Sequence, residues 1–298
     1  MMQLDLYRVF YITALEQNLS KAAKKLYITQ PSVSYAIKQL EERLETPLFI
    51  RTSKGVLLTK EGQVLFESIE PAFALIHKAE QRIAEFKHLK RGHVTIGGSD
   101  STCKHYLLPY IQTFQDRYAD IQIKLHHGST PQIIEKLTNG LIDIGIVHLP
   151  IAENHVHVTD FLTISSTFVV GKKYKELANQ TLSLEDILHY PLISFSESSS
   201  SRKFLEQLFR KQDLHVQPDI EVGSVELLKE CAKIGMGIAF VTKELVQQEL
   251  ANEELFEVHV NVEIADRKVG LITQKNGPLS NAANKFFKHL NQNNTKFK

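Results

Sequence analysis

The residues that could do chemistry lie in four short polar segments of the C-terminal two-thirds of the chain. Hydroxyl groups and free backbone N–H groups at helix starts bind anions and small polar molecules, and Arg202 or Lys104 could add a positive charge. Each hydroxyl could equally cap a helix or hold a turn, so their gathering in one cleft is what would indicate a ligand site. The candidate ligand-binding residues are Ser99, Asp100, Ser101, Thr102, Cys103, Ser129, Thr130, His148, Ser196, Ser198 and Arg202.

The same segments predict the kind of ligand, a small organic acid or an amino-acid-like molecule. Asp100 and Glu197 stand among the hydroxyls, and their charges disfavour a bare polyanion while leaving a ligand of mixed charge open. Cys103 has two open interpretations, a redox sensor or, more commonly, a small buried side chain.

The sequence contains no recognisable catalytic or cofactor motif: a nucleophile elbow, a Walker loop and GxGxxG are all missing. The serines at 198–201 have no evident base. Adjacent His126 and His127 would point to opposite faces of a strand, while His155 and His157 share a face without further ligands. We therefore expect no enzyme, no metal and no cofactor other than the small molecule.

A second polar group lies near the N-terminus, on two short helices expected at 20–26 and 31–44. A tight turn joins them, and Pro31 suits the first turn of the second helix. This is helix-turn-helix geometry, in which the second helix enters the major groove and its N-terminal side chains reach base edges. The serines and Gln30 could equally be helix caps. The predicted DNA-binding residues are Ser20, Thr29, Gln30, Pro31, Ser32, Ser34, Tyr35, Lys38, Arg51 and Lys54.

Three further segments frame these helices. Apolar residues predict a helix over 4–17, with Leu15 on its apolar face, and two short strands over 48–50 and 56–58, with Arg51 and Lys54 in the turn between them. A basic hairpin beside a recognition helix is a wing that meets phosphate or the minor groove, although Lys54 could be a solvated loop charge. A helix over 59–89 follows, with a heptad pattern that needs a partner helix. Its seam is Leu65, Ile69, Ala72, Ile76, Ala79, Ile83 and Phe86.

From Gly92 the chain alternates strands and helices. Strands at 93–97, 121–126 and 144–149 enclose helices at 107–118 and 131–139, and a second series starts near Leu162. A β-α-β-α-β order favours a parallel α/β sheet, and two such halves suggest a ligand cleft between them, at the carboxyl ends of strands.

Composition agrees with a two- or three-domain globular protein of 298 residues. Residues 1–60 hold nine Lys/Arg and five Asp/Glu, a local net charge of +4 in a chain of net charge +1, which weakly favours a nucleic-acid partner. Two distant cysteines, no signal-peptide pattern and no stretch of about 20 apolar residues predict a cytoplasmic protein with no membrane partner.

The order of motifs over the first 62 residues resembles the start of a LysR-type transcriptional regulator. The matching points are Ala22-Ala23, Thr29-Gln30-Pro31, Val33-Ser34, Ile37-x-x-Leu40-Glu41, Leu44, Pro47-Leu48-Phe49, Arg51 and Thr59-x-x-Gly62, and weaker matches continue in Leu108-Pro109, Gly140-x-x-Asp143-x-Gly145-Ile146 and Val225-x-x-Leu228-x-x-x-x-Ala232-x-x-Gly235-x-Gly237-Ile238-Ala239. Tyr35 stands where the family often has Arg, so the preferred base sequence stays open.

The resemblance implies an α/β protein with three parts. These are a winged helix-turn-helix over 1–60, a linker or dimerisation helix over 61–90, and a two-lobed effector-binding domain over 91–298 like a periplasmic binding protein. Lobe one is implied at 92–161 and 267–298, and lobe two at 162–266. In the family, positions matching Ser99, Ser101 or Thr102, and Thr130 contact the effector.

We therefore predict a homodimeric or homotetrameric regulator that binds double-stranded DNA. An effector would shift the placement of its heads, and RNA polymerase is a candidate partner. Two rivals are a solute-binding protein without a DNA role and an enzyme using the cleft. A signal peptide would favour the first, and a convergent acid–base pair the second.

Overall fold

The computed structural model describes residues 4–53, 55–87, 92–275, 277 and 279–292. The chain forms two compact units, Met1–Gln81 and Arg82–Lys298, each with its own core. We describe each unit by itself.

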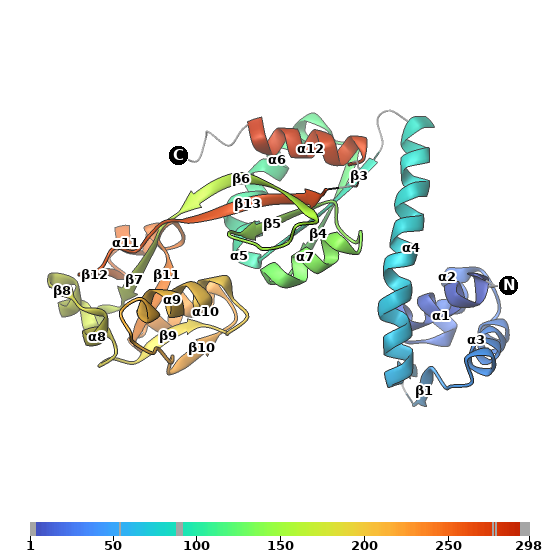
Figure 1. The fold of residues 1–298 in the computed structure, drawn as a ribbon, viewed down its shortest axis with the longest axis horizontal. Coiled ribbons are helices and arrows are strands. Elements are labelled where there is room, and N and C mark those ends of the chain that lie inside the picture. The colour runs from blue at the N-terminus through green and yellow to red at the C-terminus, as the bar shows by residue number, and fades with distance from the viewer. Residues whose placement is uncertain (1–3, 54, 88–91, 276, 278, 293–298) are drawn as a thin grey trace. The chain divides into compact units, whose positions relative to one another are not determined.

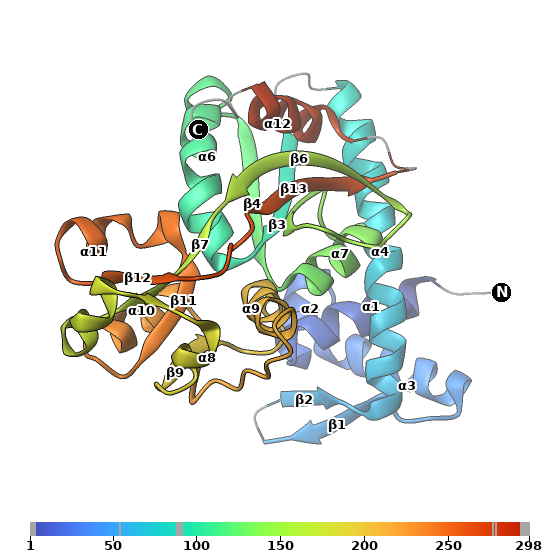
Figure 2. The same ribbon diagram turned by 60° about the vertical axis from the view of Figure 1, so that its left-hand side comes forward.

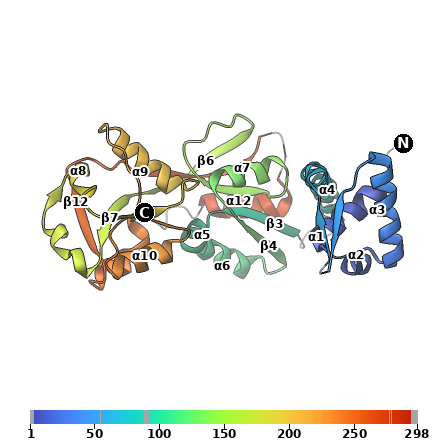
Figure 3. The same ribbon diagram turned by 90° about the horizontal axis from the view of Figure 1, so that it is seen from below.

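The first unit is a set of helices with a two-stranded hairpin (Figures 2 and 3). Its elements are α1 (Leu4–Glu16), α2 (Leu19–Leu26), α3 (Gln30–Leu44), β1 (Phe49–Thr52), β2 (Gly55–Leu58) and α4 (Lys60–Lys87). The expected helices and the wing are therefore present. Arg51 lies within β1, opposite Val56, rather than in the turn, and Lys54 and Leu89 lie outside the described residues.

Side-chain caps fix where the two short helices begin. The Asn18 side chain accepts hydrogen bonds of 3.0 Å from the backbone N–H groups of Ser20 and Lys21, so Asn18, not Ser20, caps α2. Thr29 caps α3 by accepting from the backbone of Ser32. The left-handed backbone of Tyr27, φ 56°, ends α2 and makes the turn between the helices short, because it stops one helix three residues before the next begins.

The first half of α4 belongs to the core of the first unit. Tyr11 of α1 stacks on Phe66 and Phe73 of α4, with ring centroids 5.8 and 5.2 Å apart. Phe10 and Leu40 are fully buried beneath them. Leu15, which we expected on the buried face of α1, is 45% exposed, because the next helices pack against the face through Phe10 and Ala14.

The second unit has two lobes, each a sheet with helices on both faces (Figure 1). Lobe one has strand order β4-β3-β5-β13-β6. Its elements are β3 (Gly92–Gly98), α5 (Asp100–Thr102), a π-helical turn (Cys103–Leu107), α6 (Leu108–Arg117), β4 (Ile121–His127), α7 (Thr130–Thr138), β5 (Ile144–His148), β6 (Val156–Ile164), β13 (Arg267–Gln274) and α12 (Asn281–Gln292).

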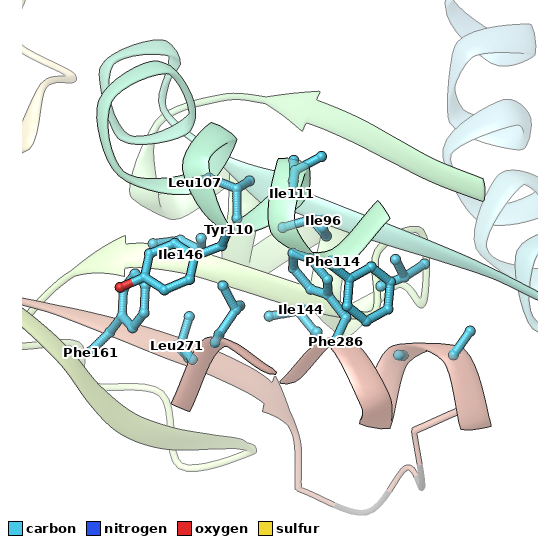
Figure 4. Packing of buried hydrophobic residues seen from close by; sticks show 14 of the residues in the cluster. Ile96, Leu107, Tyr110, Ile111, Phe114, Ile144, Ile146, Phe161, Leu271 and Phe286 are labelled. Atoms are coloured by element: carbon cyan, nitrogen blue, oxygen red, sulfur yellow. The ribbon is translucent and has the colours of Figure 1, made fainter. Parts of the chain in front are cut away.

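The core of lobe one lies between its sheet and the helices α6 and α12 (Figure 4). Phe114 of α6 meets Phe286 of α12 edge to face, with centroids 4.8 Å apart, and both side chains are fully buried. The apolar side chains of α7 form a separate cluster with other strand residues. The sheet is thus covered on both faces, as its apolar strands require.

Lobe two has strand order β10-β9-β11-β7-β12-β8. Its elements are β7 (Ser166–Val170), a 3-10 helix (Lys172–Asn179), β8 (Thr181–Leu182), α8 (Leu184–Ile187), β9 (Leu192–Phe195), α9 (Ser200–Arg210), β10 (Ile220–Val222), α10 (Val225–Lys233), β11 (Ile238–Thr242), a 3-10 helix (Lys243–Leu245), α11 (Gln247–Ala251) and β12 (Phe256–Val260).

Two long strands, β6 and β13, connect the lobes and make the sheet of lobe one mixed, and β7, antiparallel to β11 and β12, does the same for the sheet of lobe two. The chain enters lobe two directly from β6 and returns into β13, which pairs antiparallel with β5 and β6. β3 pairs parallel with β4 and β5, as the β-α-β-α-β order predicts. The order of strands and helices along the sequence did not reveal that β13 runs antiparallel to its neighbours. This direction places Arg267, the first residue of β13, at the junction of the lobes.

The core of lobe one yields the first prediction. Phe114→Ala removes a fully buried ring and should lower the free energy of unfolding of the second unit by about 3–5 kcal/mol, measured by urea titration with circular dichroism. Leu227→Ala, at a side chain 56% exposed, is the control and should change it by less than about 0.5 kcal/mol. Equal effects of the two substitutions would contradict this packing.

Candidate functional site

A cavity of about 220 Å³ lies in the second unit, lined by residues of both lobes. Most of its wall comes from the segments that follow β3 and β4 in lobe one and β9 and β10 in lobe two, and strand residues such as His148 at the end of β5 and Thr242 at the end of β11 add to it. Ligands in α/β folds bind at the carboxyl ends of strands, and the volume fits a molecule smaller than most drugs. We call this cavity the interlobe pocket.

Helix starts supply most of the pocket's polar groups. Ser99, Ser199 and Ser224 are the side-chain caps of α5, α9 and α10, and all three line the pocket. The Ser99 hydroxyl also lies 2.7 Å from that of Thr102 and 3.1 Å from that of Ser101. Capping and ligand contact are therefore compatible here, because a hydroxyl that accepts from the backbone can still donate its own proton.

Several contacts join the lobes at the pocket, two of them between side chains at helix starts and in the turn after β3. The hydroxyls of Thr130 and Ser200 are 3.2 Å apart, and Lys104 forms an ion pair with Glu226. Glu226 lines the pocket, so Lys104 balances one of its two acidic groups, the other being Asp100. Lys104 was expected as a charge for the ligand, and in this structure its partner is a carboxylate of the opposite lobe.

Nine of the eleven predicted ligand-binding residues line this one pocket. They are Ser99, Asp100, Ser101, Thr102, Ser129, Thr130, His148, Ser196 and Ser198. Cys103 and Arg202 are not part of the lining. Arg202 turns away because its buried guanidinium pairs with Glu206 at 2.7 Å and Glu221 at 3.1 Å. The expected cationic contribution of Arg202 is wrong for this geometry.

Cys103 packs against the core of lobe one. Burial, with a smaller contribution from Asp100, raises the pKa of the Cys103 thiol to about 11. A thiol that stays protonated at neutral pH is a poor nucleophile. Of the two interpretations, the buried small side chain agrees with this environment.

Several lining residues were not predicted from the sequence. Tyr106 lies in the π-helical turn, Ser224 starts α10, and Thr242 ends β11. Ser224 follows a strand and precedes a helix, the same signal that selected the other serines, and it could have been found. Tyr106 and Thr242 carry no such local signal, because the folding of the lobes decides that they face the cavity.

Two ionisable groups lie in or behind the pocket wall, His148 in the lining and Arg267 behind Ser201 and Thr242. Burial, helped by the positive charge of Arg267, lowers the pKa of His148 to about 4, so this imidazole is neutral at physiological pH. Its Nδ1 atom is buried and has no hydrogen-bond partner among the residues that the structure describes. Arg267 is 6% exposed and donates to the hydroxyls of Ser201 and Thr242, which line the pocket.

The first unit has its own polar surface at the start of α3. Thr29, Gln30, Pro31 and Ser32 are exposed, and Ser34 is half-buried. Gln30 donates to the Ser34 hydroxyl at 3.1 Å, which orients both side chains at the helix terminus. Ser20 is exposed one residue into α2.

A groove of about 240 Å³ brings the wing and α3 together. Ser34, Tyr35, Lys38 and Arg51 all line it. Tyr35 is 64% exposed and accepts a 3.1 Å hydrogen bond from Gln39. Four of the ten predicted DNA-binding residues, from helix and wing, therefore share one groove.

The described part of the chain contains no group of three or more His, Cys, Asp or Glu side chains that could hold a metal ion. Over the same residues, no helix is long and apolar enough to cross a membrane.

A winged helix-turn-helix followed by a two-lobed α/β unit with a small polar pocket defines a class of DNA-binding regulators with a ligand-binding domain. The profile of the LysR substrate binding domain matches residues 87–295. That of the bacterial regulatory helix-turn-helix protein, lysR family, matches residues 4–63. The chain belongs to the LysR family: it is a DNA-binding transcriptional regulator with an effector-binding domain, not an enzyme.

Individual relatives agree over the whole length. A probable RuBisCO transcriptional regulator of Cyanidioschyzon merolae is 29% identical over 294 residues, which cover 96% of this chain and 97% of the relative. The transcriptional activator CmpR of Synechocystis is 26% identical over 284 residues, covering 95% and 93%. The crystal structure of full-length CbnR complexed with its target DNA has the same fold, with a TM-score of 0.72 at 16% identity and coverage of 98% and 99%.

The environment of His148 gives the second prediction. Because its folded pKa, about 4, lies below the unfolded value near 6.5, the unfolded chain takes up a proton that the folded chain does not. The contribution of neutral His148 to the free energy of unfolding is fully present above pH 6.5 and is lost as the pH falls toward 4. Between pH 7 and 4.5 the free energy of unfolding should fall less in His148→Gln than in the wild type, by on the order of 1–3 kcal/mol.

Urea unfolding across this pH range measures the effect. His215→Gln, at an exposed histidine, is the control and should keep the wild-type slope. A slope that His148→Gln leaves unchanged would mean that the imidazole is not buried as a neutral group.

Proposed function

We propose that the start of α3 reads base edges in the major groove while the wing holds the DNA backbone. The observation that carries this proposal is the shared groove, where Ser34, Tyr35 and Lys38 of the helix meet Arg51 of the wing. Gln30, Pro31 and Ser32 extend the surface to the helix terminus, where free N–H groups favour phosphate. Ser20 and Thr29, with Lys54, complete the proposed set.

We further propose that a small effector in the interlobe pocket modulates this regulator. Four segments that follow strands bring hydroxyl groups at helix starts to the pocket, those before α5, α7, α9 and α10, and they suit a small organic acid or an amino-acid-like molecule. The contacts of Ser99, Thr102 and Thr130 would change when an effector binds, because these hydroxyls now bond to each other or across the lobes.

The exposed half of α4 supports a dimer or tetramer. Seam residues near the head, Leu65 and Ile69, are half-buried, whereas Ile76 and Ile83 are 41% and 61% exposed. The side chain of Phe86 lies outside the described part of the structure. An apolar seam that its own unit leaves open is suited to a second copy of the helix. A cytoplasmic location and contact with RNA polymerase complete the proposal.

Selection of genomic fragments by the purified full chain tests the DNA interface. Gln30→Ala combined with Ser34→Ala should abolish enrichment of particular sites, because lost bidentate base contacts cost about 1–3 kcal/mol of discrimination each. Arg51→Ala should instead weaken binding to all sequences and lower the salt dependence by about one counterion.

The matched control for this experiment is Gln217→Ala with Ser68→Ala, two exposed side chains distant in sequence from α3. This variant should enrich the same sites as the wild type. If the Gln30/Ser34 variant enriches those sites as well, the recognition surface lies elsewhere.

The effector proposal is tested by the triple variant Ser99→Ala, Thr102→Ala and Thr130→Ala. Small-molecule fractions of a cell extract that shift the DNA affinity of the wild type should have an effect on the variant at least about tenfold weaker, because a lost hydrogen bond to a charged ligand costs about 1.5–3 kcal/mol. Ser183→Ala removes a helix cap that is not part of the pocket lining and controls for stability. An unchanged response of the triple variant would contradict the proposed site.

A further inference from the structure

Arg267 is a buried cation at the junction of the lobes. It is 6% exposed, begins β13, and lies with its guanidinium carbon 4.9 Å from the ring centroid of Phe204. Its Nη1 donates to the Ser201 hydroxyl at 3.1 Å and its Nη2 to the Thr242 hydroxyl at 3.0 Å. Its Nε is buried, and no described residue accepts a hydrogen bond from it.

The charge of Arg267 has no carboxylate to balance it within 4.0 Å, as far as the described residues go. Glu244 influences it from a longer range. The Oε1 atom of Glu244 accepts from the backbone and hydroxyl of Ser165, and its Oε2 atom is buried with no hydrogen-bond partner among the described residues. Arg202 is the contrast: it is equally buried and has two carboxylates. Since removing a charge from water is expensive unless it is paired, an unpaired buried arginine requires another explanation.

Neutralisation does not supply that explanation. Burial lowers the pKa of Arg267 to about 10, which leaves the guanidinium protonated at physiological pH. The positive charge is therefore present in the folded protein, and its electrostatic effect reaches the pocket, because it contributes to the lowered pKa of His148.

The hydrogen bonds of Arg267 also prepare the pocket wall. Ser201 and Thr242 line the pocket and accept from the guanidinium, so their own O–H protons remain free to donate toward a ligand. Tyr106, another lining residue, has a buried hydroxyl with no hydrogen-bond partner in the described part of the chain. Hydroxyl donors backed by a cation stabilise a negative oxygen more strongly than neutral hydroxyls do.

We propose that Arg267, acting through Ser201 and Thr242, makes the interlobe pocket select a ligand with one carboxylate over its neutral analogue. This inference rests on the proposed function, that the pocket holds the effector. Asp100 and Glu226 also line the pocket, and their charges oppose a multiply charged anion such as phosphate. Arg267 is a positioning residue here, because the two hydroxyls stand between it and the cavity.

Thermal unfolding of the full chain tests the proposal with paired probes, benzoate and benzamide and lactate and lactamide, together with inorganic phosphate. All are titrated at constant ionic strength with sodium chloride. The wild type should be stabilised by a monocarboxylate more than by its amide or by phosphate. Arg267→Gln should weaken carboxylate binding about tenfold or more, the size of a lost charge-assisted contribution, and change amide binding less than about twofold.

Two further variants separate this role from a structural one. Arg267→Lys keeps the charge but loses the planar fork, and it should retain part of the carboxylate preference. Arg202→Gln removes a buried arginine of the same region and should lower the melting temperature while leaving the preference intact. In NMR titrations, Arg267→Gln should raise the pKa of His148, whose signal is assigned by its loss in His148→Gln, and Arg202→Gln should not.

The outcomes are distinguishable. If the wild type prefers amides or phosphate, or if Arg267→Gln binds carboxylates as the wild type does, the role of Arg267 is wrong and effector binding stands. If neither acids nor amides stabilise the wild type at millimolar concentration, the pocket does not hold a small polar ligand and the effector proposal fails with the inference. An unchanged pKa of His148 in Arg267→Gln would also overturn the inference, whatever the probes do.

Discussion

Backbone N–H groups in the first turn of a helix have no partner inside that helix, and this constraint shapes both units of the protein. In the first unit it is met at α3 by Thr29, and the exposed Gln30 and Ser34 stand beside the remaining donors. In the second unit Ser99, Ser199 and Ser224 cap helices whose starts converge on one cavity. The same short polar residues therefore satisfy backbone N–H groups at helix starts and contribute side chains to a candidate binding surface.

Convergence in the second unit follows from strand direction. Parallel strands end at one edge of a sheet, and the loop after each leads into a helix start, so hydroxyls far apart in sequence meet there. The antiparallel strand β13 adds what this scheme lacks, a cation. Arg267 is the first residue of its strand, whereas the hydroxyls lie after the ends of theirs. It belongs to a strand of lobe one and donates hydrogen bonds to hydroxyls of lobe two.

This difference explains how far the sequence could predict the site. The hydroxyls of Ser99, Thr130 and Ser196 were predicted because their signal is local: polar residues between a strand and a helix. The positive charge was assigned to Arg202 or Lys104, which stand in or directly after such polar segments. Whether an arginine faces a cavity or two glutamates depends on Glu206, one turn further along α9, and on Glu221 in the next strand. Tertiary contacts therefore decide where the guanidinium of Arg202 lies, and the same holds for Arg267.

The fold was predicted more completely than the site, because periodicity and helix caps are also local signals. Where the prediction failed, tertiary packing decided the outcome. Leu15 follows the helical pattern of α1, yet packing selects a neighbouring face. Arg51 belongs to a strand because backbone pairing with Val56 extends the wing beyond its apolar residues. The apolar seam of α4 has two different environments. Leu65 packs in the core of the first unit, whereas Ile83 is exposed. A continuous heptad could not reveal this division, because it records which residues are apolar and not which partner covers each of them.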